Sequence, residues 1–179
     1  LSNGWQHYSG TNGYWAPAEY SCADGLVVVS GLVKNGNWGD IGTLPSGCRP
    51  QHNLIFSMNN HENQARVDVY TDGRIKWITG GKDHSWISLS GIVFSTTDAT
   101  LLPLSNGWQH YSGTNGYWAP AEYASARGLT VVQGLIKNGN WGSNMGNLPQ
   151  SPPDCALTPT QNLIYSVNNH AKSARVKVD

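Results

Sequence analysis

The sequence predicts an all-β protein made of two tandem β-sandwich, jelly-roll-like repeats, and three observations support this prediction. Short apolar runs rich in β-branched residues recur along the chain, with turns rich in Gly and Pro between them. No segment shows the 3.6-residue spacing of apolar residues that is typical of an amphipathic helix. The segment Leu1–Tyr20 recurs without change as Leu104–Tyr123. A duplicated, strand-rich unit of about 100 residues has the size of one sandwich domain.

The repeat divides the chain into two units. We define the first copy as residues 1–103 and the second copy as residues 104–179. The correspondence extends beyond the identical segment, because Asn59-Asn60-His61 matches Asn168-Asn169-His170. A Pro-rich insertion in the second copy, near residues 150–160, indicates a loop.

Strand-like patterns account for most of the first copy. One of them, Ala65–Tyr70, alternates apolar and polar residues, so its apolar side chains share one face. Asp68 lies on the other face and becomes Lys177 in the second copy, so we expect Asp68 to face solvent. The Asp72-Gly73 pair predicts a hairpin turn after this strand. The predicted strands are Leu26–Val33, Leu54–Met58, Ala65–Tyr70, Ile75–Thr79 and Trp86–Phe94.

The second copy is expected to lack its C-terminal strands, because it has no counterpart of Arg74–Thr79 or Trp86–Phe94. A sandwich without these strands exposes an edge and part of its core. Three explanations are open: a longer natural chain, an incomplete sequence, or strands supplied by another chain. We favour the first two over strand exchange.

Composition narrows the classes of function. Charged residues make up 12% of the chain and the formal net charge is zero. Nucleic-acid binding requires a basic surface, so we expect no nucleic-acid partner. No apolar stretch is long enough for a transmembrane helix, so we expect no membrane insertion. The chain starts at Leu1 without a leader, which we interpret as a mature or excerpted product.

Catalytic residues are not predicted. Glycoside hydrolysis usually requires two carboxylates in defined roles, and Glu19 with its copy Glu122 is the only acidic position shared by both copies. The sequence has no G-x-S-x-G nucleophile motif and no His pair with zinc-ligand spacing. It also has no Asp-rich calcium loop. We therefore expect no enzymatic activity, no metal and no cofactor.

Carbohydrate binding is better supported. The chain has eight Trp and eight Tyr, whose rings combine an apolar face with a hydrogen-bonding group. Three stretches place such rings or His beside Asn, Asp or Arg and recur in the second copy, and a fourth occurs once. The predicted carbohydrate-binding residues are Asn37, Trp38, Asn60, His61, Arg66, Asp83 and His84 in the first copy, and Asn140, Trp141, Asn169, His170 and Arg175 in the second.

Each of these stretches also has a structural interpretation. Asn-Gly pairs form turns for backbone reasons alone, and Asn59-Asn60-His61 closes a predicted strand. Trp5, Trp15 and Trp86 stand beside apolar residues, so we expect them in the core rather than in a binding surface. Trp38 stands between Asn37 and Gly39, and exposure and burial are equally compatible with that setting.

The three cysteines suggest one disulfide. Cys48 corresponds to Cys155, whereas Cys22 corresponds to Ser125, so a bridge between Cys22 and Cys48 is the simplest pairing. Cys155 would then be unpaired or bridged to another chain, and three buried thiols are the alternative. The low charge, the missing leader and the polar-aromatic composition favour an extracellular setting.

Several motifs of the first copy carry a resemblance to known proteins. They are Leu44-Pro45-Ser46-Gly47-Cys48-Arg49-Pro50, Asp72-Gly73-Arg74-Ile75 and Ser90-Gly91-Ile92. This series resembles β-rich modules at the tips of phage tail fibres. It is also similar to tandem-repeat, lectin-like modules in secreted proteins of sponges and corals. The second copy departs from the pattern, with Asp154-Cys155-Ala156 where Arg-Pro would stand. The resemblance implies a β-sandwich, oligomerisation and adhesion to glycans or surfaces.

Together these observations predict a secreted, multivalent lectin of the hemagglutinin type. We expect it to crosslink glycans or glycoproteins and to form a homo-oligomer, since two weak sites on one chain gain avidity. The alternatives are a structural or adhesive module of the extracellular matrix and a glycan-degrading enzyme.

Overall fold

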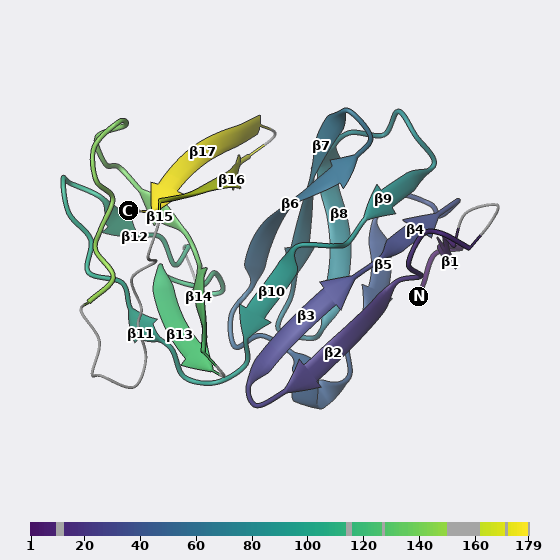
Figure 1. Ribbon diagram of the computed structural model, residues 1–179, viewed down its shortest axis with the longest axis horizontal. Coiled ribbons are helices and arrows are strands. Elements are labelled where there is room, and N and C mark those ends of the chain that lie inside the picture. The colour runs from purple at the N-terminus through teal and green to yellow at the C-terminus, as the bar shows by residue number, and fades with distance from the viewer. Residues whose placement is uncertain (10–12, 114–115, 127, 150–161, 171, 179) are drawn as a thin grey trace.

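The computed structural model describes residues 1–9, 13–113, 116–126, 128–149, 162–170 and 172–178, and the predicted all-β class is confirmed (Figure 1). Apart from the short 3-10 turn η1 (Ser46–Cys48), the regular elements of these residues are strands. None of the described helices is long and apolar enough to span a membrane. The strands of residues 1–101 are β1 (Gln6–His7), β2 (Glu19–Ala23), β3 (Leu26–Ser30), β4 (Leu32–Lys34), β5 (Asp40–Thr43), β6 (Leu54–Asn60), β7 (Asn63–Val69), β8 (Arg74–Gly80), β9 (Trp86–Ser88), β10 (Ile92–Ser95) and β11 (Thr100–Leu101). The later strands are β12 (Gln109–His110), β13 (Glu122–Ala126), β14 (Leu129–Gln133), β15 (Ile136–Lys137), β16 (Leu163–Asn169) and β17 (Lys172–Val178).

Two layers of antiparallel strands form the first copy. One layer is the four-stranded sheet β5-β8-β7-β6. The other consists of the sheets β10-β3-β2 and β1-β4-β9, which follow one another because only Gly31 separates β3 from β4. In Figure 1 the four-stranded sheet lies behind β2, β3 and β10. Apolar side chains of both layers meet between them, including Leu54, Val67, Ile87 and Phe94.

The predicted Asp72-Gly73 hairpin is confirmed between β7 and β8. The Tyr70 N–H donates to the Arg74 carbonyl oxygen at 2.9 Å, and Gly73 has φ +89°. A positive φ is easy for Gly and strained for most other residues. The Asp-Gly sequence therefore fixes the point at which the chain reverses.

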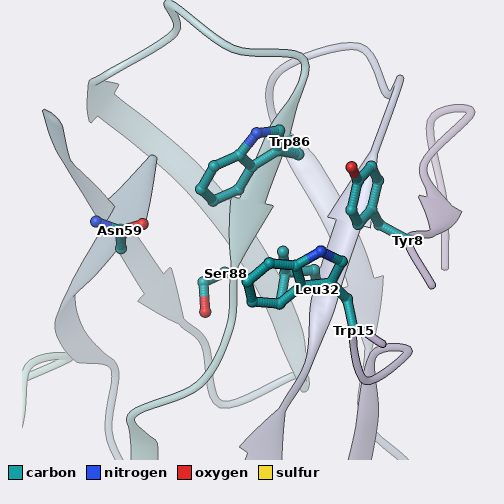
Figure 2. A pocket seen from close by; sticks show the side chains of 6 residues that line it. All are labelled: Tyr8, Trp15, Leu32, Asn59, Trp86 and Ser88. Carbon is teal, nitrogen blue, oxygen red and sulfur yellow. The ribbon is translucent and has the colours of Figure 1, made fainter. Parts of the chain in front are cut away.

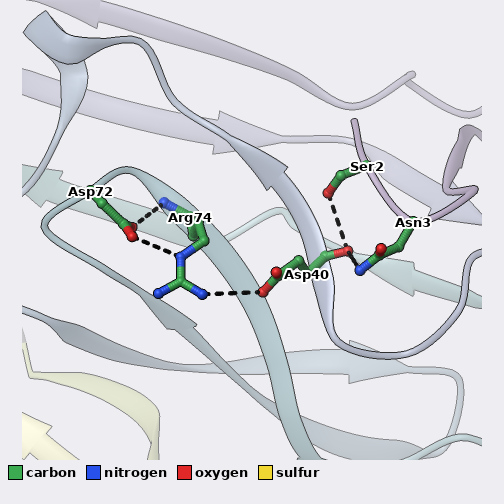
Figure 3. Close-up of polar contacts among 5 residues, drawn as sticks. All are labelled: Ser2, Asn3, Asp40, Asp72 and Arg74. Atoms are coloured by element: carbon green, nitrogen blue, oxygen red, sulfur yellow. Dashed lines mark hydrogen bonds and ion pairs between the residues drawn. The ribbon is translucent and has the colours of Figure 1, made fainter.

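Polar contacts link this hairpin to the N-terminus (Figure 3). The Arg74 guanidinium donates to the Asp72 carboxylate at 2.7 Å and lies 3.8 Å from the Asp40 carboxylate. The Asp40 carbonyl oxygen accepts hydrogen bonds from the side chains of Ser2, at 3.3 Å, and Asn3, at 3.0 Å. The first residues of the chain are thereby held against β5.

Two of the predicted strands are divided in the structure. The segment Leu26–Val33 becomes β3 and β4 with a break at Gly31, whose φ is +88°. A Cβ at Gly31 would lie 2.0 Å from the Pro17 carbonyl oxygen, so a side chain has no room there. Trp86–Phe94 is likewise divided into β9 and β10. A continuous apolar run in the sequence did not reveal either break.

The predicted disulfide between Cys22 and Cys48 is present and joins β2 to η1. It ties an edge strand of one layer to the turn that precedes β6. Cys155 and the Pro-rich insertion near 150–160 lie outside the described residues.

The strand pairs of the second copy repeat those of the first in the same register. β12 pairs with β15 as β1 does with β4, and β13 pairs with β14 as β2 does with β3. β16 pairs with β17 as β6 does with β7. Among the described residues, the second copy has no counterpart of β5, β8, β9 or β10.

The second copy packs on the outer face of the four-stranded sheet. The Trp118 ring lies 5.5 Å from the Arg66 guanidinium and 6.5 Å from the Tyr70 ring. The expectation that Asp68 faces solvent is wrong, since it is 1% exposed. Its carboxylate accepts two hydrogen bonds from Arg66, at 2.7 and 2.8 Å. Burial raises the pKa of Asp68 above its ordinary value, and the nearby Arg66 opposes this rise.

Candidate functional site

An open pocket of about 300 Å³ lies against the first copy (Figure 2). Three aromatic side chains dominate its lining, and one leucine and two small polar side chains complete it. None of the lining side chains is charged. The lining residues are Tyr8, Trp15, Leu32, Asn59, Trp86 and Ser88.

Backbone pairing around β4 brings these segments together. The Tyr8 N–H donates to the Leu32 carbonyl oxygen at 3.0 Å, and the Leu32 N–H donates to the Ala16 carbonyl oxygen at 3.0 Å. Leu32 also pairs with Ser88 across the β4–β9 ladder. Segments that are far apart in the sequence are thus fixed around one strand, which makes the pocket a preformed feature of the sheet.

The tryptophans of the first copy occupy different environments. Trp5 is buried, as expected, and its ring lies so close to Gly36 that a Cβ there would be 2.1 Å from the ring. Trp86 is half-buried. The expectation of burial is wrong for Trp15, which is 56% exposed. Trp15 lies in the segment that crosses β4 on its way to β2, so the ring stands beside the sheet instead of between the layers.

Figure 2 shows the Trp15 and Trp86 indoles on two sides of the pocket, with the Tyr8 ring beside them. The Asn59 amide nitrogen donates to the His61 carbonyl oxygen at 2.6 Å. This contact directs the amide nitrogen away from the pocket and leaves the Asn59 side-chain oxygen on the pocket side (Figure 2). The pocket therefore offers a fixed acceptor at Asn59, together with hydroxyl groups of Ser88 and Tyr8.

Three of the predicted binding residues, His61, Asp83 and His84, gather in the loops next to this pocket. The rings of His61 and His84 lie 4.2 Å apart, and they are 6.3 Å and 6.0 Å from the Trp86 ring. Asp83 accepts a hydrogen bond from the Asn63 side chain. These loops therefore lie beside Trp86, the first residue of β9.

Asn60 has a different role from the one predicted. It is fully buried, and its amide nitrogen donates to the backbone carbonyl oxygens of His84, at 3.1 Å, and Trp86. Asn60 thus holds the loop that carries Trp86. Successive residues of a strand point to opposite faces, so the neighbouring Asn59 faces the pocket while Asn60 faces inward.

Asn37 and Trp38 do not line the pocket. Trp38 is half-buried, and its ring lies 5.3 Å from both the Trp5 ring and the Trp77 ring. The Lys82 ammonium lies 4.0 Å from the centre of the Trp77 ring. Aromatic packing of this kind stabilises the fold, and it accounts for Trp38 without a ligand. Asn37 is exposed, and its N–H donates to the Asn3 carbonyl oxygen at 2.9 Å.

Arg66 also lies away from the pocket, since its guanidinium binds Asp68 on the face covered by the second copy. The predicted residues of the second copy, Asn140, Trp141, Asn169, His170 and Arg175, are all exposed. Trp141 packs edge-on against Trp108, with ring centres 5.1 Å apart. None of these five residues lines the pocket of the first copy.

The predicted binding residues do not include those that line the pocket, although Tyr8, Asn59 and Trp86 belong to the polar-aromatic stretches of the sequence; the lining residues outside these stretches are Trp15, Leu32 and Ser88. Two of the lining residues had a usable signal. Tyr8 belongs to the polar-aromatic stretch Gly4–Tyr8, and Trp15 follows Tyr14 in a segment introduced by Gly13. Tyr14 and Trp15 are adjacent aromatic residues in a turn, and both are exposed, which distinguishes them from core residues.

In comparisons with known proteins, no family model, curated protein or solved structure matches the chain. Among the described residues, no group of three or more His, Cys, Asp or Glu side chains could hold a metal ion. The functional argument therefore depends on the geometry of the pocket.

Proposed function

We propose that the protein binds neutral glycans, with the aromatic pocket of the first copy as the binding site. The observation that carries the proposal is the pocket lining, in which Tyr8, Trp15 and Trp86 accompany Asn59 and Ser88. The C–H face of a sugar ring stacks on an aromatic ring, and its hydroxyl groups pair with amide and hydroxyl groups. An uncharged lining matches a neutral sugar better than a phosphate or a carboxylate.

Crosslinking of glycans is the second part of the proposal. The first copy has all six lining residues, whereas the described part of the second copy supplies Tyr111, Leu135 and Asn168 without a counterpart of Trp86. The counterpart of Trp15 is Trp118, which packs on Arg66 instead. A homo-oligomer would bring several pockets together and raise weak affinity through avidity. We therefore propose that the protein forms a homo-oligomer, and that this oligomer crosslinks glycans and agglutinates cells.

Secretion also belongs to the proposal. The Cys22–Cys48 disulfide is compatible with an oxidising compartment, where such bonds persist. The resemblance of the first copy to lectin-like modules of sponges and corals, and to phage tail-fibre tips, points to the same extracellular setting.

The Trp15→Ala variant of the full chain tests the pocket. Trp15 is largely exposed, so the variant should fold while losing a stacking surface. Loss of one aromatic contact of about 1.4 kcal/mol corresponds to about tenfold weaker binding. A glycan array would identify ligands of the unmodified chain, and calorimetry would then compare affinities. The matched control is Tyr14→Ala, because Tyr14 is 84% exposed and does not line the pocket.

Two results would contradict the proposal. One is an array without binding by the unmodified chain at concentrations where millimolar affinity is detectable. The other is an equal loss of affinity in the Trp15 and Tyr14 variants, which would place the glycan elsewhere on the surface.

One observation favours a second function, that of an adhesive or matrix module. The strand β16 of the second copy exposes Leu163, Ile164, Tyr165 and Val167, and exposed apolar strands promote association. Sedimentation of the purified chain distinguishes the two functions. A discrete small oligomer supports the lectin, whereas open-ended assemblies support the matrix module.

A further inference from the structure

The polar groups of the aromatic pocket are not interchangeable, because neighbouring contacts fix what each of them offers to a ligand. The Asn59 amide nitrogen donates to the His61 carbonyl oxygen at 2.6 Å, so the side-chain oxygen is the atom that Asn59 turns toward the pocket (Figure 2). A carboxamide oxygen accepts hydrogen bonds and cannot donate them. Asn59 therefore favours a ligand that has an N–H or O–H donor at this point.

Ser88 has the complementary preference. Its hydroxyl oxygen accepts a hydrogen bond from the Ser90 N–H at 3.3 Å, and among the described residues this is the one hydrogen bond that the hydroxyl makes. A hydroxyl group has one proton to donate. That proton is available to a ligand, so Ser88 favours a ligand acceptor such as a carbonyl oxygen.

An apolar side chain lies directly beside this hydroxyl. Leu32 and Ser88 are opposite each other in the β4–β9 ladder, and both line the pocket. The Cβ atoms of residues paired in this way are about 5 Å apart. A ligand group that accepts a hydrogen bond from Ser88 and also places an apolar atom on Leu32 must therefore be small.

The acetamido group combines the features that these three side chains favour. It has an N–H donor for Asn59 and a carbonyl oxygen for Ser88, and its methyl group is bonded to the same carbon as that oxygen. A sugar hydroxyl also donates and accepts hydrogen bonds, but it has no apolar atom to place on Leu32. Removal of a methyl group from water is favourable and adds to affinity. The acetamido group is also uncharged, as is the pocket lining.

We propose that the pocket recognises the acetamido group of an N-acetylhexosamine residue, an inference that rests on the proposed binding of neutral glycans. The acetamido group lies against Asn59, Ser88 and Leu32, and the sugar ring stacks on the Trp15 or the Trp86 indole (Figure 2). The pocket volume of about 300 Å³ is at the lower limit for ligand pockets, which suits a single sugar residue.

Matched pairs of sugars test the proposal with the full 179-residue chain. The probes are the methyl glycosides of glucose, galactose and mannose, each compared with its 2-acetamido derivative by calorimetric titration. We expect the acetamido member of at least one pair to bind about tenfold more tightly, as one added hydrogen bond and one buried methyl group imply. Saturation-transfer NMR should give the acetyl methyl protons the strongest signal of the bound sugar.

Variants locate the acetamido group on the protein. Asn59→Ala and Ser88→Ala should each reduce the preference for the acetamido sugar about fivefold, because each removes one of its hydrogen bonds. Asn168→Ala is the control for Asn59, since Asn168 donates to the His170 carbonyl oxygen at 2.8 Å in the same way and does not line the pocket. Ser85→Ala is the control for Ser88, because Ser85 is exposed and lies outside the lining. Both controls should keep the preference, and far-UV circular dichroism checks the fold of every variant.

The outcomes distinguish this inference from the proposed function. Equal affinities within all three pairs, or glycan-array ligands that contain no acetamido sugar, would overturn the inference while glycan binding stands. An array without any ligand would overturn the proposed function and the inference together. A preference that Asn59→Ala and Ser88→Ala leave unchanged would place the acetamido group outside this pocket and overturn the inference as well.

Discussion

Leu54 and Leu163 occupy the same position in the two copies, and their replacement by Ala should affect stability very differently. Leu54 is 2% exposed in the core between the two layers, so Leu54→Ala removes a fully packed side chain and leaves a cavity. Substitutions of this kind reduce the free energy of unfolding by about 2–5 kcal/mol, and we expect about 3 kcal/mol here.

Leu163 is 42% exposed, so only part of its side chain leaves water on folding. Full burial of a Leu side chain contributes about 1.5–3 kcal/mol, and solvent fills the space that Ala leaves at an open face. We therefore expect Leu163→Ala to reduce the free energy of unfolding by about 1 kcal/mol.

Urea unfolding followed by far-UV circular dichroism measures both losses, and hydrogen exchange assigns each loss to its copy. Protection of β6 and β7 amides should fall in Leu54→Ala, and protection of β16 and β17 amides should fall in Leu163→Ala. Equal losses in the two variants, or the larger loss in Leu163→Ala, would refute the conclusion that the same sequence is covered in one copy and open in the other.

Two further predictions concern the first copy. The Cys22–Cys48 disulfide spans a sequence separation of 26, so its removal in the Cys22→Ser, Cys48→Ser double variant should reduce the free energy of unfolding by about 3.5 kcal/mol in the chain-entropy model. Urea unfolding with and without reductant measures this, and a loss below about 1 kcal/mol would contradict it. Hydrogen bonds from the backbone and side chain of Arg74 hold the pKa of Asp72 below its ordinary value of 3.8. The corresponding stabilisation is present above the unfolded-state pKa and is lost as pH falls through the lower folded-state pKa. The stability difference between the unmodified chain and Asp72→Asn should therefore be constant above about pH 5 and shrink as pH falls from there through the folded-state pKa, and urea midpoints that differ by a constant amount would disprove the coupling.

Much of the fold could be predicted from local patterns. Alternation in residues 65–70 defines β7, and Asp72-Gly73 defines the turn to β8, because both depend on neighbouring residues alone. Comparison of the two copies led to the Cys22–Cys48 pairing, since Ser125 stands at the position of Cys22. Two predicted strands are divided, one at Gly31 and one after Ser88, and these patterns did not predict either break. At Gly31 the break depends on the Pro17 backbone, which lies against it and is distant in sequence.

The candidate site was harder to predict, because the position of each lining residue depends on contacts distant in sequence. Asn60 and Asn59 are adjacent and chemically identical, yet Asn60 braces the loop before Trp86 and Asn59 faces the pocket. Arg66 has the chemistry of a ligand-binding residue, but Asp68 and Trp118 engage it. Residue type indicated which hydrogen bonds these side chains can form. The face of the strand on which each side chain lies decided its partners.

The sequence by itself determined the β class, the duplication, the hairpin and the disulfide, because strand alternation, turn chemistry and repetition are properties of the chain read in order. Tertiary structure decided which aromatic rings are buried. Trp5 and Trp38 pack together in the first copy, and Trp15 remains at the surface beside β4. It also decided that Leu54 is covered and Leu163 is not, although the two strands have related sequences. Burial depends on which other strands lie opposite, and in the first copy β8, β9 and β10 cover the core.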